Sequence, residues 1–173
     1  TLTLTNGTIC MPGRIILTAG RNTDDRITTA RTIARENHWP LLDVNDMTST
    51  LARHIVGDAT GDPDSRTSCL FKTIVEPAQR QALLNTVWAQ VDAGVPGVVV
   101  SAPLISELAI PEWLNELNYD LGLQGYEATV VYVLADGELA PELDPEHYAL
   151  EVPAKVEDLF AAATRVAINV RGE

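Results

Sequence analysis

The feature that most constrains the fold is a series of short, uninterrupted apolar runs, each followed by a helical pattern. The strongest runs are 97–101 (GVVVS) and 128–134 (ATVVYVL), and a third is 14–20 (RIILTAG). Continuous runs rich in β-branched residues are typical of strands buried on both faces, as in a parallel sheet. The alternation of strands and helices therefore predicts an α/β fold: a mainly parallel five-stranded sheet with helices on both faces, in three layers.

The other elements follow from apolar spacing and turn residues. Helices are expected at about 24–37, 47–56, 69–93, 111–121 and 156–163, and further strands at 40–43, 148–152 and 166–170. The stretch 57–65 (GDATGDPDS) contains only residues typical of turns. No internal repeat or linker divides the chain, so we expect a single domain over 1–173, with 1–12 as an N-terminal extension.

Charge and composition exclude several functional classes. Twelve basic residues against 24 acidic ones give a formal charge of −12, which repels nucleic-acid phosphates. No window reaches the roughly 18 apolar residues of a membrane span, and no secretion signal opens the chain, so a cytoplasmic location is expected. Cys10, Cys69 and three scattered histidines form no metal-ligand pattern, so no metal site is expected.

In an open parallel sheet, ligands bind beyond the carboxyl ends of the strands. Here those ends lead into 20–25, 43–46, 101–103 and the residues from Asp136 onward. The candidate functional residues are therefore sought in these four segments.

Several of these segments, in this order and spacing, resemble the small P-loop kinases of actinobacteria and their phages, often labelled AAA-family ATPases. The pieces that carry the resemblance lie between about 14 and 163: IILTAGRNTDDRITTARTIARE, WPLLDVNDM, EPAQRQALLNTVWAQVDAGVPGVVVSAP, PEWLNEL and TVVYVLAD. The resemblance implies a P-loop kinase-like fold, a phage-encoded or actinobacterial origin and, in an active member, ATP and Mg²⁺.

The phosphate loop of that family is a glycine, four residues, Gly-Lys and then Ser or Thr. Carried onto this chain, the pattern places Gly20 at the first glycine, Asp25 at the second and Arg26 at the lysine. Two unit charges ~4 Å apart repel by ~4 kcal/mol at an effective dielectric constant of ~20, so Asp25 disfavours phosphate. Ile27 replaces the metal-binding hydroxyl, and Thr28 follows one position late. The candidate nucleotide-contacting residues are Gly20, Arg21, Asn22, Thr23, Asp24, Asp25, Arg26 and Thr28.

The acidic turn after the second strand corresponds to the family's acceptor-binding or magnesium-organising acids. It contains Asp43 and Asp46, which together with Arg26 are the candidate catalytic residues if the protein is active. The alternative interpretation makes Asp46 the N-cap of a helix beginning near Met47. Ser101 lies where many P-loop proteins carry a second metal-associated acid.

The family's lid, whose arginines close over the triphosphate, corresponds to 137–147 (GELAPELDPEH), which contains no arginine. The region 136–158 holds eight carboxylates and a single lysine, Lys155. Such a run either forms a solvated face or attracts a partner with a basic surface.

Three hypotheses follow. The first is a catalytically degenerate kinase-like protein that needs no cofactor and acts by binding a small ligand or a protein with a basic surface. The second is an active ATP- and Mg²⁺-dependent phosphotransferase acting on a nucleotide, nucleoside or other small hydroxyl compound. In the third, the turn 18–22 (TAGRN) resembles that of SLOG-type Rossmann proteins, which implies a nucleotide-derived ligand bound without magnesium.

Overall fold

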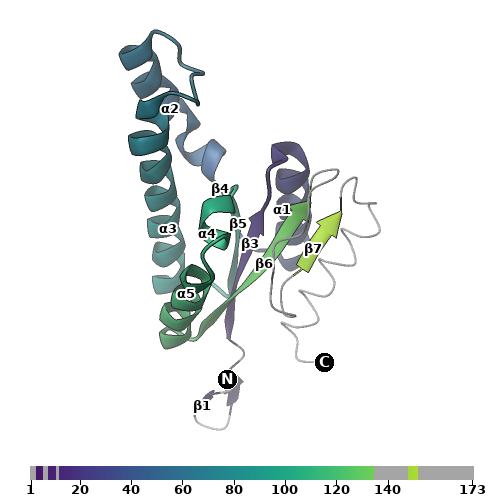
Figure 1. Ribbon diagram of the computed structural model, residues 1–173. Helices are drawn as coiled ribbons and strands as arrows, with labels where there is room; N and C mark the ends of the chain where they lie inside the picture. Colours follow the sequence, from purple (N-terminus) through teal and green to yellow (C-terminus); the bar gives the residue numbers. More distant parts are fainter. Residues whose placement is uncertain (1–2, 6–7, 11, 135–147, 152–173) are drawn as a thin grey trace.

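A computed structural model describes residues 3–5, 8–10, 12–134 and 148–151 (Figure 1). Its centre is a parallel sheet in the order β4-β5-β3-β6-β7. The strands are β3 (Gly13–Ala19), β4 (Leu41–Asp43), β5 (Gly97–Ser101), β6 (Tyr126–Leu134) and β7 (Tyr148–Glu151). Every neighbouring pair is parallel. The predicted α/β class with a mainly parallel sheet is confirmed, and the three strongest apolar runs lie side by side as β5, β3 and β6.

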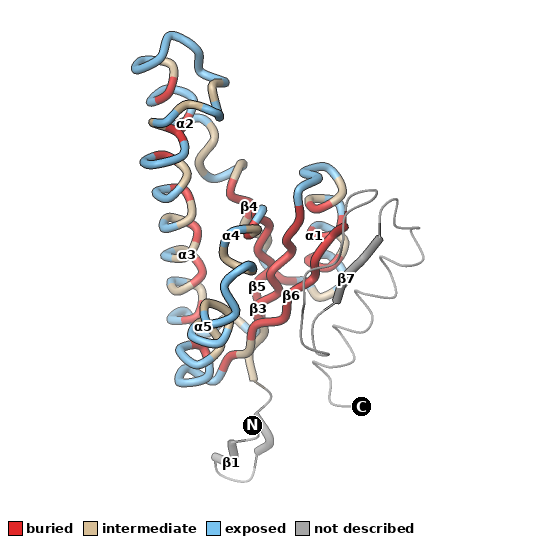
Figure 2. Tube along the Cα trace, viewed as in Figure 1, coloured by how far each residue is buried: buried red, intermediate tan, exposed pale blue. Residues whose placement is uncertain are grey.

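Helices cover both faces of the sheet. On one face, α1 (Thr23–Asn37) buries Ala30 and Ile33 against the strands. On the other face lie α3 (Glu76–Asp92) and α5 (Pro111–Leu123), which bury Leu83 and Leu121 among others. Figure 2 shows the buried residues concentrated in β3, β5 and β6 between these layers.

The long helix expected over 69–93 is two elements. A π-helical turn, η1 (Phe71–Val75), precedes α3, and Pro77 stands in the first turn of α3. Proline has no backbone N–H to donate. The change from π-helical to α-helical hydrogen bonding near Pro77 therefore leaves one fewer N–H group without an acceptor. Phe71 and Val75 pack against α2 (Val44–Thr60), which extends with α3 beyond the sheet in Figure 1.

The remaining elements are short. Two antiparallel strands, β1 (Thr3–Thr5) and β2 (Thr8–Cys10), form within the N-terminal extension and were not predicted. A four-residue helix, α4 (Ile105–Leu108), follows β5. The helix expected at 156–163 and the strand at 166–170 lie outside the described residues. Across the part of the chain that the structure describes, no helix combines the length and apolarity of a membrane span.

Candidate functional site at the carboxyl ends of the strands

A row of polar residues crosses three neighbouring strands at their carboxyl ends. Asp43 of β4 is the register partner of Ser101 of β5, which is the partner of Thr18 of β3. All three side chains are buried. The residues two positions earlier in each strand pack in the same cluster as α1, and residues two apart in a strand point to the same face of the sheet. The three polar side chains therefore lie on the face toward α1. The fold therefore brings together polar groups from segments far apart in the sequence.

The turn after β3 depends on Gly20. Its φ of +134° lies in a region that favours glycine, and a Cβ there would be 2.3 Å from the Val133 carbonyl oxygen of β6. The Gly20 N–H donates to the Pro103 carbonyl at 3.2 Å. The turn is thus held between β6 and the segment that follows β5.

The start of α1 uses amides that a phosphate loop would leave available. Asn22 is the N-cap, and its Oδ1 accepts hydrogen bonds from the Asp24 and Asp25 N–H groups at 3.1 and 3.3 Å. A phosphate loop places free backbone amides before the helix begins, whereas Asp24 and Asp25 already belong to the first turn of α1. The turn left between strand and helix is only 20–22.

Arg26 lies beneath this turn with none of its surface exposed. Its Nη1 donates to the Gly20 carbonyl at 2.8 Å, and its Nε donates to Ser101 Oγ at 3.3 Å. Burial lowers the pKa of the Arg26 guanidinium from its ordinary value, and the nearby Asp43 carboxylate acts in the opposite direction. The side chain is therefore part of the buried polar row rather than a group directed into solvent.

Asp43 ends β4 and begins α2. It is 2% exposed, and its Oδ1 accepts from the Asn45 and Asp46 N–H groups at 2.9 and 3.1 Å. The interpretation of Asp46 as the N-cap is therefore wrong: α2 begins at Val44, because Asp43 keeps the extended backbone that a cap requires. Asp46 lies exposed in the first turn, where a negative charge favours the helix dipole.

The predicted site residues thus separate into a buried group, an exposed group and the half-buried Asp25. Gly20, Arg26 and Asp43 meet at the buried strand ends. The exposed ones are Arg21, Asn22, Thr23, Asp24, Asp46 and Thr28.

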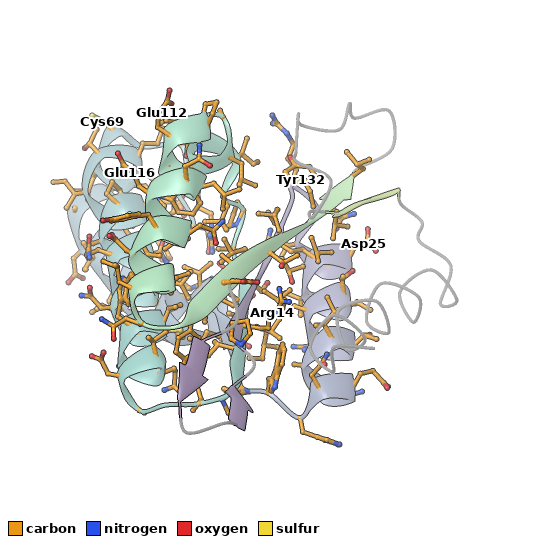
Figure 3. The ribbon with its side chains drawn as sticks, turned by 90° about the horizontal axis from the view of Figure 1, so that it is seen from below. Arg14, Asp25, Cys69, Glu112, Glu116 and Tyr132 are labelled. Carbon is orange, nitrogen blue, oxygen red and sulfur yellow. The ribbon has the colours of Figure 1, made fainter. Side chains whose placement is uncertain are left out.

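Figure 3 places Asp25 on the α1 side of the sheet and Cys69, Glu112 and Glu116 on the opposite side. Among the residues described, no three His, Cys, Asp or Glu side chains are grouped to hold a metal ion.

On the α3 face, the same strand ends open into a cavity of about 170 Å³ that sequence reasoning missed. Its walls come from the start of α2, the segment 102–107, the start of α3, and Arg66 and Phe71. Arg80 donates to Ser106 Oγ at 2.8 Å and forms an ion pair with Glu107, while the Arg66 guanidinium lies 5.6 Å from the centroid of the Phe71 ring. Neither arginine belongs to a recognisable motif.

The backbone of the cavity wall is unusual at one position. Leu104 is buried and has a φ of +50°, the left-handed region that non-glycine residues rarely adopt. Such conformations persist only where the surrounding structure fixes them, and they are concentrated at functional sites. The segment after β5 is therefore shaped as part of the cavity.

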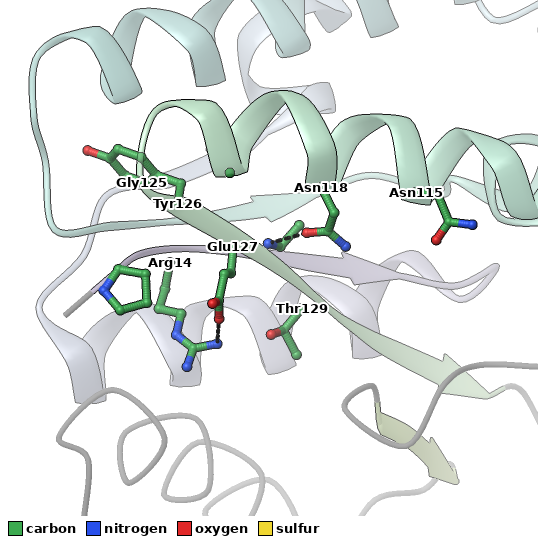
Figure 4. A pocket seen from close by; sticks show the side chains of 10 residues that line it. Arg14, Asn115, Asn118, Gly125, Tyr126, Glu127 and Thr129 are labelled. Carbon is green, nitrogen blue, oxygen red and sulfur yellow. Dashed lines mark hydrogen bonds and ion pairs between the residues drawn. The ribbon is translucent and has the colours of Figure 1, made fainter. Parts of the chain in front are cut away.

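A second hollow, of about 630 Å³, lies at the amino ends of β3 and β6 (Figure 4). Arg14 and Glu127, paired on neighbouring strands in its wall, form an ion pair at 3.0 Å, and Asn118 Oδ1 accepts the Ala128 N–H at 2.8 Å. It opens at the end of the sheet opposite the usual ligand crevice of open parallel sheets. The cavity on the α3 face is the better candidate for a ligand site.

Sequence comparisons identify no relatives: no protein-family model and no curated protein matches the chain. Solved structures do resemble it. A crystal structure from Chloroflexus aurantiacus, described as a "putative kinase", has a TM-score of 0.61 at 13% identity, covering 94% of this chain and 97% of that one. A gluconokinase from Sinorhizobium meliloti has a TM-score of 0.50 at 17% identity, covering 93% and 97%.

These likenesses define the fold. The chain has an α/β fold of the P-loop kinase type, as the resemblance in the sequence implied. At such low identity the likeness extends to the fold alone, and fold does not determine activity.

Proposed function

We propose that this protein is a kinase-like fold that binds a small polar ligand in the cavity on the α3 face and does not transfer phosphate from ATP. The proposal rests on the burial of Arg26. Its guanidinium donates hydrogen bonds to the Gly20 carbonyl and to Ser101 Oγ. In a phosphate loop, the lysine at this position would instead extend toward the phosphates of the nucleotide. The degenerate character of the phosphate loop is part of this proposal.

ATP and Mg²⁺ do not fit the residues present. The amides of Asp24 and Asp25 are bonded to Asn22, and both side chains add negative charge where phosphate oxygens would lie. Ile27 offers no ligand for magnesium, and Ser101 already accepts a hydrogen bond from Arg26. Binding a triphosphate would require breaking these contacts without replacing them.

An active phosphotransferase would need Asp43 as its base. A general base must come within hydrogen-bond reach of the proton that it removes. Asp43 is almost fully buried, and one of its oxygens caps α2. This arrangement favours a structural role for Asp43 and supports binding over catalysis.

The cavity on the α3 face offers the chemistry of a small-ligand site. Its floor is apolar, with Val44, Ala102 and Leu104, and its polar groups include both donors and acceptors, such as Arg66 and Glu76. Apolar walls with a few convergent polar groups are typical of small-molecule sites. A partner protein with a basic surface stays a prediction from the acidic run 136–158, because most of that run lies outside the described residues.

A thermal-shift panel tests the proposal. The probes are ATP, GTP, nucleosides and gluconate, each with and without Mg²⁺, against the unaltered protein, Arg80→Ala and Arg53→Ala. Arg53 pairs with Asp64 at 2.6 Å outside the cavity and is the matched control. We expect stabilisation by a small hydroxyl compound that Arg80→Ala removes and Arg53→Ala retains. Magnesium-dependent stabilisation by ATP would contradict the proposal.

A further inference from the structure

At the carboxyl ends of the strands, three buried polar atoms on the α1 face have no hydrogen-bond partner among the described residues. They are Thr18 Oγ1, Arg26 Nη2 and Asp43 Oδ2, and each belongs to the polar row or to the side chain that covers it. Buried polar atoms in folded proteins are nearly always paired with protein or with ordered water. Arg26 and Asp43 lie close enough to interact electrostatically, so the unpaired atoms of these two side chains point to a bound group between them.

The charges around these atoms restrict what that group can be. Arg26 can only donate and an ionised Asp43 can only accept, so a group between them must do both. For an anion, attraction to Arg26 is offset by repulsion from Asp43, and for a cation the reverse holds, so the pair of opposite charges favours a small neutral group. The two residues interact electrostatically, yet among the ion pairs of the described residues none joins them directly. Water has the required chemistry, and it bridges polar groups in this way elsewhere in proteins.

We propose that one bound water accepts a hydrogen bond from Arg26 Nη2 and donates one to Asp43 Oδ2, making a water-bridged ion pair inside the fold. Arg26 is then the permanent counter-ion of Asp43. The inference deepens the proposed function, because it explains why the nucleotide side of the strand ends is closed by the protein's own side chain.

The pair also connects the closed side with the cavity. Asp43 caps α2, whose first residues Val44 and Asn45 line the cavity, and Ser101 directly precedes the lining residue Ala102. Arg26 donates a hydrogen bond to Ser101 and interacts electrostatically with Asp43. It therefore holds in place, from the α1 face, the two residues that precede the cavity wall at the start of α2 and after β5. Arg26 is therefore a positioning residue for the cavity and has no contact with the ligand.

A double-mutant cycle tests the pair. Arg26→Met keeps the length of the side chain without its charge, and Asp43→Asn keeps an oxygen to cap α2. At pH 7 we expect Arg26→Met to unfold far more readily than the parent, and the double variant to recover part of that loss. Effects of the two substitutions that simply add would overturn the ion pair. Arg26→Lys, which keeps a charge, is expected to be more stable than Arg26→Met.

A high-resolution crystal structure of the unaltered protein tests the water without any variant. Density for a water within hydrogen-bond distance of Arg26 Nη2 and Asp43 Oδ2 is expected. Direct contact between the two groups, or a metal ion bound there, would overturn the bridge. Neither the crystal structure nor the double-mutant cycle involves ATP. Binding of ATP would therefore refute the proposed function without refuting the ion pair. Absence of the ion pair would not by itself refute the proposed function.

Discussion

The two faces of the sheet differ where β4 and β5 end. On the α1 face the ends of β3, β4 and β5 are covered by Arg26, and the amides at the start of α1 are capped by Asn22. On the α3 face the residues that follow β4 and β5 surround a cavity of about 170 Å³. Among the described residues, the strand ends are therefore closed on the α1 face, and the cavity lies on the opposite face of the sheet.

The largest expected effect is on the closed face. Arg26→Met leaves Asp43 as a buried charge without its counter-ion, and loss of one partner of a buried pair costs about 3–5 kcal/mol. Urea unfolding at pH 7 measures this loss. Arg53→Met removes an exposed pair with Asp64 and is expected to cost about 0–1 kcal/mol. Equal losses for the two variants would show that Arg26 has no special role.

Gly20→Ala is expected to destabilise the turn between the two faces. The new side chain would meet the Val133 carbonyl at 2.3 Å and would hold a φ of +134° that alanine rarely adopts. Backbone strain of this kind costs about 1–3 kcal/mol, and the close contact adds to it. Gly61→Ala is the matched control, because that glycine also has a positive φ but nothing lies within 4 Å. If both substitutions cost the same, the close approach of β6 does not constrain Gly20.

Asn22→Ala removes the cap of α1. We expect a loss of about 0.5–2 kcal/mol, because two N–H groups lose their acceptor. Asn22→Gly is expected to cost less, since glycine is tolerated at this position. Thermal unfolding of the two variants compares them, and an unchanged midpoint for Asn22→Ala would mean that the cap does not hold the start of α1.

The smallest effect on stability is expected for a substitution in the cavity on the α3 face. The same substitution is expected to have the largest effect on ligand binding. Arg80→Ala breaks a partly exposed pair with Glu107 and should change stability by about 0–1 kcal/mol. It also removes a polar group of the cavity wall, so any ligand found in the thermal-shift panel should bind at least several-fold more weakly. Unchanged affinity would place the ligand elsewhere, with the hollow at the amino ends of β3 and β6 as the next candidate.

The fold was predictable because its strands are apolar on both faces. The runs at 14–20, 97–101 and 128–134 indicate buried strands from composition alone, and the helix after the first of them follows from apolar spacing. The choice between Asp43 and Asp46 as the cap of α2 was not predictable from residue type, since both are aspartates near a helix start. It depends on where β4 ends, which its pairing with β5 determines.

The site was predictable only in part. The sequence resemblance predicts that Arg26 corresponds to the lysine of a phosphate loop, which stays a prediction, and it gives no indication that the side chain is buried. That follows from the register of Thr18, Ser101 and Asp43, which places a polar row beneath α1. The cavity escaped sequence reasoning because Arg66 and Arg80 come from turn and helix positions without a motif, brought together by tertiary packing.

Isothermal titration calorimetry with ATP measures whether the closed α1 face excludes the nucleotide. The unaltered protein is titrated with ATP in the presence and in the absence of Mg²⁺, and the recovered sample is assayed for ADP. No binding heat is expected in either titration, and no ADP. Saturable binding that requires Mg²⁺, or ADP formation that Arg26→Met abolishes in a protein that remains folded, would contradict the exclusion of the nucleotide.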